Sequence, residues 1–280
     1  MLLSDNEKRK RFDEIIDDIK NIKIQGARNI ARSAIYAYSL IPANKSKEKL
    51  ISSRPTEPML QNVLSLVDTV PYSLINEHFD VAQEKINKNV FSLLKNGDLV
   101  FTHCHSTNVV NALIYAKKMG KKFEVYNTET RPLFQGRKTS KKLSKQGIHV
   151  TEFVDSAMNI VLSGSQGFTK PTAIFLGADA LLKTGVINKI GSELIAIIAK
   201  SYKIPVYVIA DSWKFTSKSI PLEQRKLEEV WDRAPKEIKI KNPAFEFINK
   251  KYISGIITEL GFFPYSKFLF LIMKKDHLTL

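Results

Sequence analysis

Apolar side chains recur at spacings of three and four residues through the first ninety or so residues of the chain. This periodicity predicts amphipathic helices over residues 11–21, 27–40 and 79–97, the last ending in the Asn-Gly pair expected just past a helix. Residues 52–62 contain Pro55 and Pro58 and are predicted to form an ordered loop. The pattern therefore predicts a helical N-terminal domain over residues 1–95.

From Gly97 onward the pattern changes to short apolar runs, each followed by an amphipathic segment. The chain is therefore expected to be an α/β protein, with a Rossmann-like, mostly parallel sheet domain over residues 96–280. Residues 268–273 are expected to form a terminal strand or helix packed on the core. The predicted strands cover residues 98–103, 123–128, 149–154, 173–178, 206–210 and 255–258, and the predicted helices cover 108–119, 140–146 and 189–202.

Reactive or charged side chains follow most of the predicted strands. Ligands of open α/β sheets bind outside the carboxyl ends of the strands, so these side chains are expected to converge at one edge of the sheet. They are Cys104, Glu129, Arg131, Asp155, Asp179, Asp211 and Lys214.

The chain of 280 residues carries a formal net charge of +15, of which +12 lies beyond residue 95. Such a charge favours a polyanionic partner. No nucleic-acid-binding module or aromatic interleaving is present, so we expect a small phosphorylated ligand and no nucleic acid. No apolar run is long enough to span a membrane, the start of the chain does not resemble a signal peptide, and the lone cysteine forms no internal disulfide. These features predict a cytoplasmic protein that binds no membrane.

The only cysteine, Cys104, lies between two histidines in the segment VFTHCHSTN. A lone cysteine is often a buried apolar residue, but here Ser106 or Thr107 can cap a following helix, and a helix N-terminus or an inward-facing imidazole would favour the thiolate. A metal site is not expected, because three adjacent residues cannot readily surround one tetrahedral ion and His78, His149 and His277 have no ligand-like spacing. A buried thiol and a chemical role both remain open from spacing alone.

Asp179 ends a very apolar strand, where partial desolvation would raise the pKa of its carboxyl and suit a general acid; capping of a turn is the alternative. Asn188 and Lys189 are predicted to open the helix over 189–202, as a phosphate or sugar-hydroxyl site or as a cap with a surface lysine. Further arginines, in Gly26-Ala27-Arg28, at Arg54 and in the loop from Arg131 to Lys138, suit phosphate binding or a subunit interface.

Taken together, an ordered series of segments resembles a known family. The segments include QGARNIARSA, SRPT, GDLVFTHCHS, VYNTETRPLFQGRKTSKKL, LGADALLKTGVINKIGSELIA, ADSWKF and NPAFEFI. The family unites the α, β and δ subunits of eukaryotic translation initiation factor 2B with methylthioribose-1-phosphate isomerase and ribose-1,5-bisphosphate isomerase, and the resemblance extends from about Ile24 to Gly261.

The resemblance implies an enzyme, because the isomerases use a Cys in the THC motif and an Asp in the GAD motif, which correspond to Cys104 and Asp179. The HCHS continuation and Lys214 look more like the ribose-1,5-bisphosphate branch, which acts in AMP metabolism and supplies ribulose 1,5-bisphosphate. By the same resemblance, substrate contacts would fall on Gly26, Ala27, Arg28, Arg54, Ser106, Thr107, Asn108, Asn188, Lys189 and Lys214.

The resemblance also implies a homo-oligomer, a dimer or a hexamer, that needs no metal or other cofactor. Two departures affect one phosphate site: Gln25 stands where the family usually has Arg, and the segment from Leu40 to Arg54 is short. An initiation-factor-like subunit that acts by binding protein and a methylthioribose-1-phosphate isomerase remain the alternatives.

Overall fold

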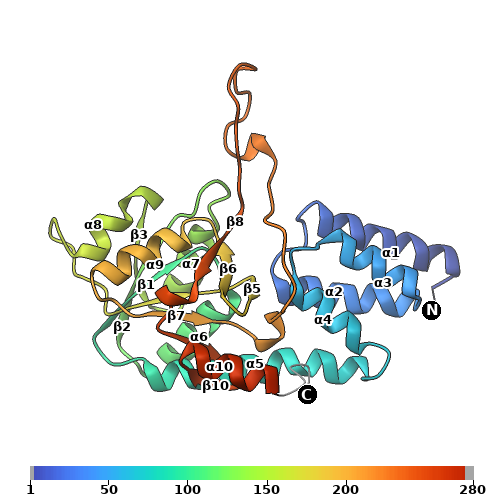
Figure 1. The fold of residues 1–280 in the computed structure, drawn as a ribbon, viewed down its shortest axis with the longest axis horizontal. Helices are drawn as coiled ribbons and strands as arrows, with labels where there is room; N and C mark the ends of the chain where they lie inside the picture. Colours follow the sequence, from blue (N-terminus) through green and yellow to red (C-terminus); the bar gives the residue numbers. More distant parts are fainter. Residues whose placement is uncertain (1–2, 275–280) are drawn as a thin grey trace.

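The structure, a computed structural model, describes residues 3–274. Five helices form the N-terminal part, two more than the three that the periodicity predicts: α1 (Asp5–Lys20), α2 (Ala27–Leu40), α3 (Asn44–Ser53), α4 (Pro58–Leu66) and α5 (Tyr72–Leu93) (Figure 1). The first of them begins with a capping box, in which Ser4 and Glu7 satisfy each other's backbone N–H groups.

The prediction of a loop over residues 52–62 is wrong for most of that segment. Helix α3 continues to Ser53, and α4 begins at Pro58. Proline suits the first helical position because the backbone N–H that it lacks would have no partner there. The true loop is therefore only residues 54–57, and it places Arg54 and Glu57 beside the sheet domain.

A sheet of seven strands forms the second part, in the order β10-β9-β7-β4-β1-β2-β3. All neighbouring strands pair in parallel except the antiparallel pair of β9 and β10. The strands are β1 (Asp98–His103), β2 (Phe123–Thr128), β3 (His149–Phe153), β4 (Ala173–Leu176), β7 (Val206–Ile209), β9 (Gly255–Thr258) and β10 (Gly261–Phe263). The expected Rossmann-like, mostly parallel sheet is confirmed.

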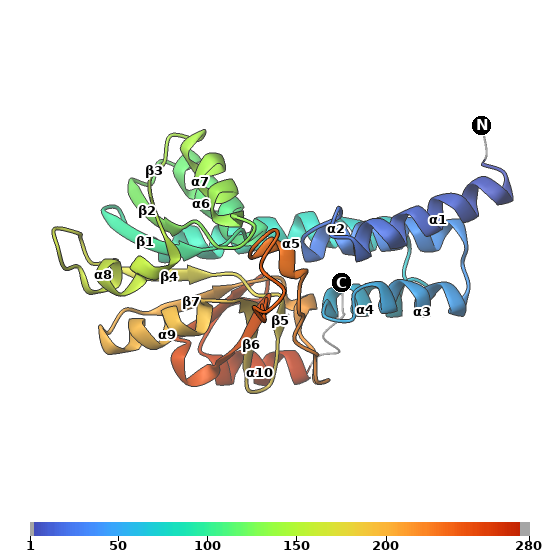
Figure 2. The same ribbon diagram turned by 90° about the horizontal axis from the view of Figure 1, so that it is seen from above.

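Helices cover both faces of this sheet (Figure 2). Successive residues of β1 point to opposite sides: Val100 packs in one apolar cluster with α5, α6 (Thr107–Lys118) and α7 (Gln135–Ser144), and Phe101 packs in another with α8 (Met158–Ser163), α9 (Ser192–Ser201) and α10 (Tyr265–Lys274). Burial on both faces explains the nearly continuous apolar runs in the sequence. The predicted terminal element is the helix α10.

A second, antiparallel sheet of three strands, absent from the prediction, consists of β5 (Ala180–Leu181), β6 (Gly185–Lys189) and β8 (Phe245–Asn249). This sheet corrects the assignment of Asn188 and Lys189. Both end strand β6, and α9 begins only at Ser192. The strand pairs with β8, more than fifty residues away in sequence, which local periodicity could not reveal.

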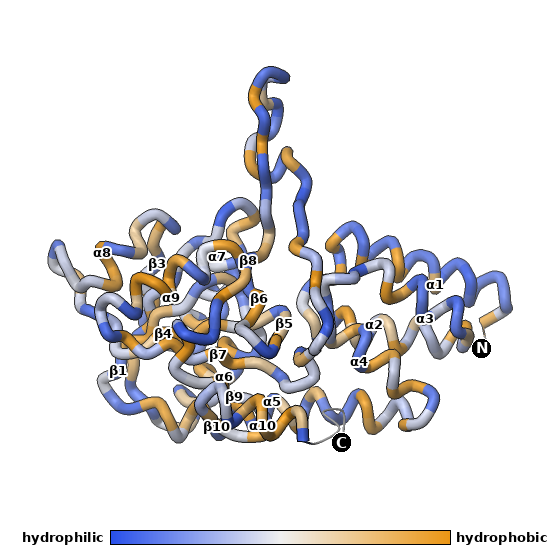
Figure 3. Tube along the Cα trace, viewed as in Figure 1, coloured by the Kyte–Doolittle hydropathy of each residue, from blue (hydrophilic) through white to orange (hydrophobic). Residues whose placement is uncertain are grey.

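Between the 3-10 turn η2 (Ser212–Lys214) and β8, the chain leaves the body in a long excursion over residues 216–242 (Figure 1). It carries only the short turn η3 (Leu227–Glu229) and mixes hydrophilic residues with isolated apolar ones (Figure 3). Its apolar side chains are at least one-third exposed at Leu222, Leu227, Val230, Trp231 and Ile238. Two further turns, η1 (Asp155–Ala157) and η4 (Lys250–Tyr252), complete the described elements, and no helix within residues 3–274 is long and apolar enough to cross a membrane.

Candidate active site

One cavity of about 300 Å³ lies between the helical part and the carboxyl edge of the parallel strands. It is lined by every residue that the sequence analysis placed at a catalytic or substrate-binding position: Gly26, Ala27, Arg28, Arg54, Cys104, Ser106, Thr107, Asn108, Asp179, Asn188, Lys189 and Lys214. Segments from both parts of the chain therefore build a single site.

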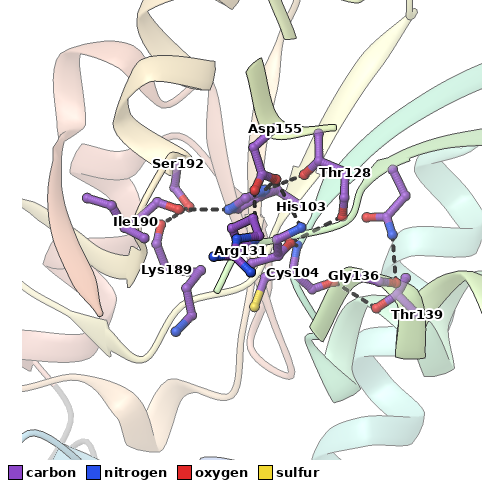
Figure 4. Close-up of polar contacts among 12 residues, drawn as sticks. His103, Cys104, Thr128, Arg131, Gly136, Thr139, Asp155, Lys189, Ile190 and Ser192 are labelled. Atoms are coloured by element: carbon purple, nitrogen blue, oxygen red, sulfur yellow. Dashed lines mark hydrogen bonds and ion pairs between the residues drawn. The ribbon is translucent and has the colours of Figure 1, made fainter. Parts of the chain in front are cut away.

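Cys104 follows β1 in a left-handed backbone conformation, with φ of 68°. Two threonines hold this conformation: the Cys104 N–H donates to Thr130 Oγ1 at 2.9 Å, and Thr139 Oγ1 donates to the Cys104 carbonyl at 2.7 Å. A non-glycine residue held in this region of φ and ψ indicates a position that the surroundings strongly determine. Figure 4 shows the sulfur pointing toward the same side as the Lys189 amine.

His103 does not act as a cation beside the thiol. Its Nε2 donates to the carbonyl of Ile190 at 2.9 Å, because a carbonyl can only accept, and in the neutral ring Nδ1 accepts from the Thr128 hydroxyl (Figure 4). Burial holds the pKa of His103 below its usual value, although Asp155 and the bond to Ile190 oppose this. The ring is a neutral support for the loop.

The second neighbouring imidazole, His105, is also neutral. Burial, with Lys138 and Lys142 nearby, lowers its pKa to about 4. Burial raises the pKa of Cys104 to about 11, and the positive charge of Lys189 counteracts this only partly. The expectation that neighbouring imidazoles favour the thiolate is therefore wrong, because both rings are desolvated and uncharged.

Asp179 lies in the turn between β4 and β5, where its backbone N–H donates to the Ile187 carbonyl at 2.8 Å. Burial raises the pKa of its carboxyl, as predicted from the apolar strand, and the cations of Lys214, Lys189 and Arg54 oppose the rise. An acid that keeps its proton inside a cationic cavity suits proton donation to a substrate oxygen.

Two buried lysines, Lys189 and Lys214, line the cavity. The Lys214 ammonium donates to the carbonyl of Ala178 at 2.6 Å, and the Lys189 ammonium lies 4.6 Å from the centre of the Phe245 ring. Asn188 donates to Ser192 Oγ at 2.9 Å, which orients the end of β6. Neither lysine has a carboxylate within ion-pair distance among residues 3–274. Their charge is available to an anionic ligand.

The arginines of the cavity are already paired. Arg54 is buried and forms a 2.8 Å ion pair with Glu223 at the base of the excursion, although its Nε atom has no hydrogen-bond partner. Arg28 pairs with Asp80 of α5. Gln25, which replaces the family's usual Arg, donates to the Ile22 carbonyl at 2.8 Å and brings no charge. This end of the cavity therefore carries less net positive charge than its arginines suggest.

The N-terminus of α6 opens onto the cavity. Of the two predicted capping residues, Ser106 is the N-cap, and it accepts a hydrogen bond from the Val109 N–H. Gly177 makes this approach possible, because a Cβ at residue 177 would lie 2.6 Å from the Ser106 Cβ. The backbone N–H groups of the first turn of α6, together with the helix dipole, favour an anion at this position.

Three charged residues expected at the sheet edge lie there, as predicted, but do not line the cavity. Asp155 instead accepts the backbone N–H groups of Thr130 and Arg131 and so holds the loop that supports Cys104. Glu129 pairs with Arg137, and the Arg131 side chain donates to the Val230 carbonyl. Their roles are structural.

The sequence analysis did not select Glu57 or Arg225 as site residues, and both line the cavity. Gln135 and Lys138, from the arginine-rich loop, also line it. The only local signal for Glu57 was its position as a charged residue between Pro55 and Pro58. Arg225 comes from an excursion without periodic pattern, so nothing in the sequence indicated its position.

His78, Asp211 and Glu259 form the one group within residues 3–274 whose ligand atoms lie close enough for a metal ion, within 4.8 Å of one another. Asp211 already accepts the Trp213 N–H at 2.9 Å, and Glu259 accepts both the N–H and the hydroxyl of Ser212. His78 stacks on Trp213 with ring centres 3.5 Å apart. This group joins α5 to the sheet domain. His277 lies outside the described residues.

A model of the initiation factor 2 subunit family matches residues 43–265. The chain belongs to this family. It is 35% identical to the ribose 1,5-bisphosphate isomerase of Methanocaldococcus jannaschii, over 90% of this chain and 91% of that protein, and 34% identical to the methylthioribose-1-phosphate isomerase of Thermosipho melanesiensis, over 90% and 86%. The solved structure of the Pyrococcus horikoshii OT3 translation initiation factor eIF-2B has a TM-score of 0.78 at 27% identity and covers 91% of this chain and 97% of that chain.

Proposed function

We propose that this member of the initiation factor 2 subunit family converts α-ribose 1,5-bisphosphate to ribulose 1,5-bisphosphate. It is an isomerase of a sugar phosphate, which the isomerase names of its relatives support. The observation that carries the finer proposal is the presence of a thiol, Cys104, and a carboxyl of raised pKa, Asp179, in one cationic cavity with a helix N-terminus.

In the proposed reaction, Asp179 gives its proton to the ring oxygen as the bond from that oxygen to C1 breaks. The Cys104 thiolate then removes the proton on C2, which yields an enol phosphate. Loss of the C2 hydroxyl proton to Asp179 and return of the other proton from Cys104 to C1 complete the ketose and restore both residues. The proton balance closes without another reactant.

The active state, with Cys104 as thiolate and Asp179 protonated, is a minor one in the free protein, because burial favours the neutral Cys104 thiol. Lys189 stabilises the thiolate, and the desolvated surroundings keep the proton on Asp179. Lys189, Lys214 and the α6 N-terminus would hold the phosphates and stabilise negative charge on the enolate-like intermediate.

The test compares the wild-type protein with Cys104→Ser and Asp179→Asn on ribose 1,5-bisphosphate and on methylthioribose 1-phosphate. The bisphosphate reaction is followed by coupling to ribulose-bisphosphate carboxylase. Since general acid and base catalysis each contribute roughly 10²–10⁴-fold, either variant should lose about that factor in kcat. The matched control is Glu124→Gln, an exposed carboxyl on β2, which should keep the wild-type rate.

Near-normal turnover by both variants would disprove the assigned mechanism. Faster turnover of methylthioribose 1-phosphate would place the protein with that branch of the family. Absence of both activities, with tight binding to a partner protein that does not depend on Cys104, would favour the initiation-factor function.

The same proposal includes a cytoplasmic homo-oligomer, a dimer or a hexamer, in AMP and nucleoside salvage toward ribulose-bisphosphate carboxylase. The family resemblance supports it, and the apolar side chains exposed along residues 216–242 are consistent with contact to a second copy.

A further inference from the structure

Glu57 occupies the N-cap position of α4 and does not behave as a cap. A carboxylate at this position normally accepts a hydrogen bond from a backbone N–H of the first helical turn. The Glu57 side chain makes no such bond and instead lines the cavity. It is 3% exposed, and its Oε2 atom has no hydrogen-bond partner among residues 3–274. A buried carboxyl oxygen without a partner costs free energy, which a ligand in the cavity can recover.

The charges around Glu57 come from every element packed against it. Arg54 directly follows α3, Asp179 lies after β4, Lys214 lies in η2 and Glu223 lies at the base of the excursion. Arg54 is already paired with Glu223. A second carboxylate beside this pair would cancel the positive charge that a phosphate needs, whereas a neutral carboxylic acid would not.

We propose that Glu57 is a further substrate-binding residue, which in its neutral form donates a hydrogen bond to the substrate phosphate held beside Arg54. The identity of that phosphate rests on the proposed function. The hydrogen bond gives the unpartnered Glu57 carboxyl a partner. It also replaces the donor that the family's usual Arg would supply at the end of the cavity where Gln25 brings no charge.

Burial raises the pKa of Glu57 to about 8, and the positive charges of Lys214 and Arg54 oppose the rise. The carboxyl is thus protonated near neutral pH and ionises as the pH passes about 8. A sugar phosphate is already a dianion there, since its second pKa is about 6. Ionised Glu57 would lose its donor and repel the phosphate, so binding should weaken on the alkaline side.

The experiment measures the dissociation constant of ribose 1,5-bisphosphate by calorimetry between pH 7 and 9.5, in a Cys104→Ser background that prevents turnover. We expect it to be flat up to about pH 8 and then to rise by up to about tenfold per pH unit. Glu57→Gln, which keeps a neutral donor, should remove the rise, and Glu57→Ala should bind more weakly than the wild type below about pH 8 and should also show no rise. Glu259→Gln is the control, because Glu259 is another buried carboxyl with a pKa raised to about 7 and does not line the cavity.

A second measurement does not depend on the substrate. Infrared difference spectra on addition of inorganic phosphate at pH 7 are recorded in an Asp179→Asn background, which removes the other protonated carboxyl of the cavity. They should show a shift of the carbonyl stretch of a protonated carboxylic acid, and Glu57→Gln in that background should abolish this band. Retention of the alkaline rise or of the band in Glu57→Gln would overturn the proposal. If the wild-type protein shows no isomerase activity but Glu57→Gln still loses both the alkaline rise and the infrared band, the result would support the role of Glu57 and contradict only the proposed function.

Discussion

At the residue scale, the chemistry of Cys104 depends on its surroundings more than on its neighbours in sequence. The adjacent histidines are neutral because both are buried, and Lys189, which is distant in sequence, supplies the charge that favours the thiolate. The thiol keeps its proton well above neutral pH.

The reactivity of Cys104 toward iodoacetamide should therefore rise by about tenfold per pH unit between pH 7 and 10, since only the thiolate reacts and its fraction grows tenfold per unit below the pKa. Lys189→Met should slow the reaction at each pH, because it removes the main stabilising charge. Cys104 is the only cysteine in the chain, so mass spectrometry of the whole protein measures the rate directly. A rate independent of pH would show that the thiolate already predominates.

At the element scale, the close approach of α6 to the end of β4 builds the anion-binding end of the cavity. The approach depends on Gly177, because a side chain there would collide with the N-cap residue Ser106. The position of one helix start thus depends on a residue some seventy positions further along the chain.

Gly177→Ala should destabilise the protein by about 1–3 kcal/mol and lower turnover, because α6 must shift away from the cavity. Urea denaturation followed by circular dichroism measures the first effect and the coupled assay measures the second. Adding Ser106→Gly removes the colliding atoms and leaves a tolerated N-cap, so the double variant should recover much of the lost stability. Without such recovery, the close contact would not be the cause.

At the scale of the whole molecule, two structural units share their cores. Helix α5 contributes Phe79 to the apolar cluster of the N-terminal helices and Val90 to a cluster of the parallel sheet. Trp213, which belongs to the sheet domain by sequence, is fully buried in the helical cluster, and Asn62 donates to its carbonyl at 2.7 Å. The cavity lies where these units meet.

Trp213→Ala should cost about 3–5 kcal/mol and lower hydrogen-exchange protection in both α4 and β7, because one buried side chain stabilises both units. Trp231→Ala, at a half-exposed position on the excursion, is the control and should change the free energy of unfolding by less than about 0.5 kcal/mol. Loss of protection in α4 alone would mean that the units unfold independently.

Much of the fold could be predicted because its signals are local. The six predicted strands appear in the sheet, since buried parallel strands are apolar throughout, and the Ser106 cap follows from its residue type. The three-stranded sheet and the short loop around Glu57 could not be predicted in this way. Strand β6 pairs with a distant segment, and Pro58 is compatible with both a loop and a helix start.

The sequence by itself determined the α/β class, the alternation of strands and helices and, through its motifs, the family. Local periodicity and residue type are sufficient for these properties, because each reflects the backbone and its nearest neighbours. Only the tertiary structure decided the ionisation of Cys104 and His103, the positions of Asn188 and Lys189 on a strand, and the place of Glu57 in the wall of the cavity. These properties depend on burial and on charges brought together from distant segments. The distances between such segments cannot be read from the order of the residues.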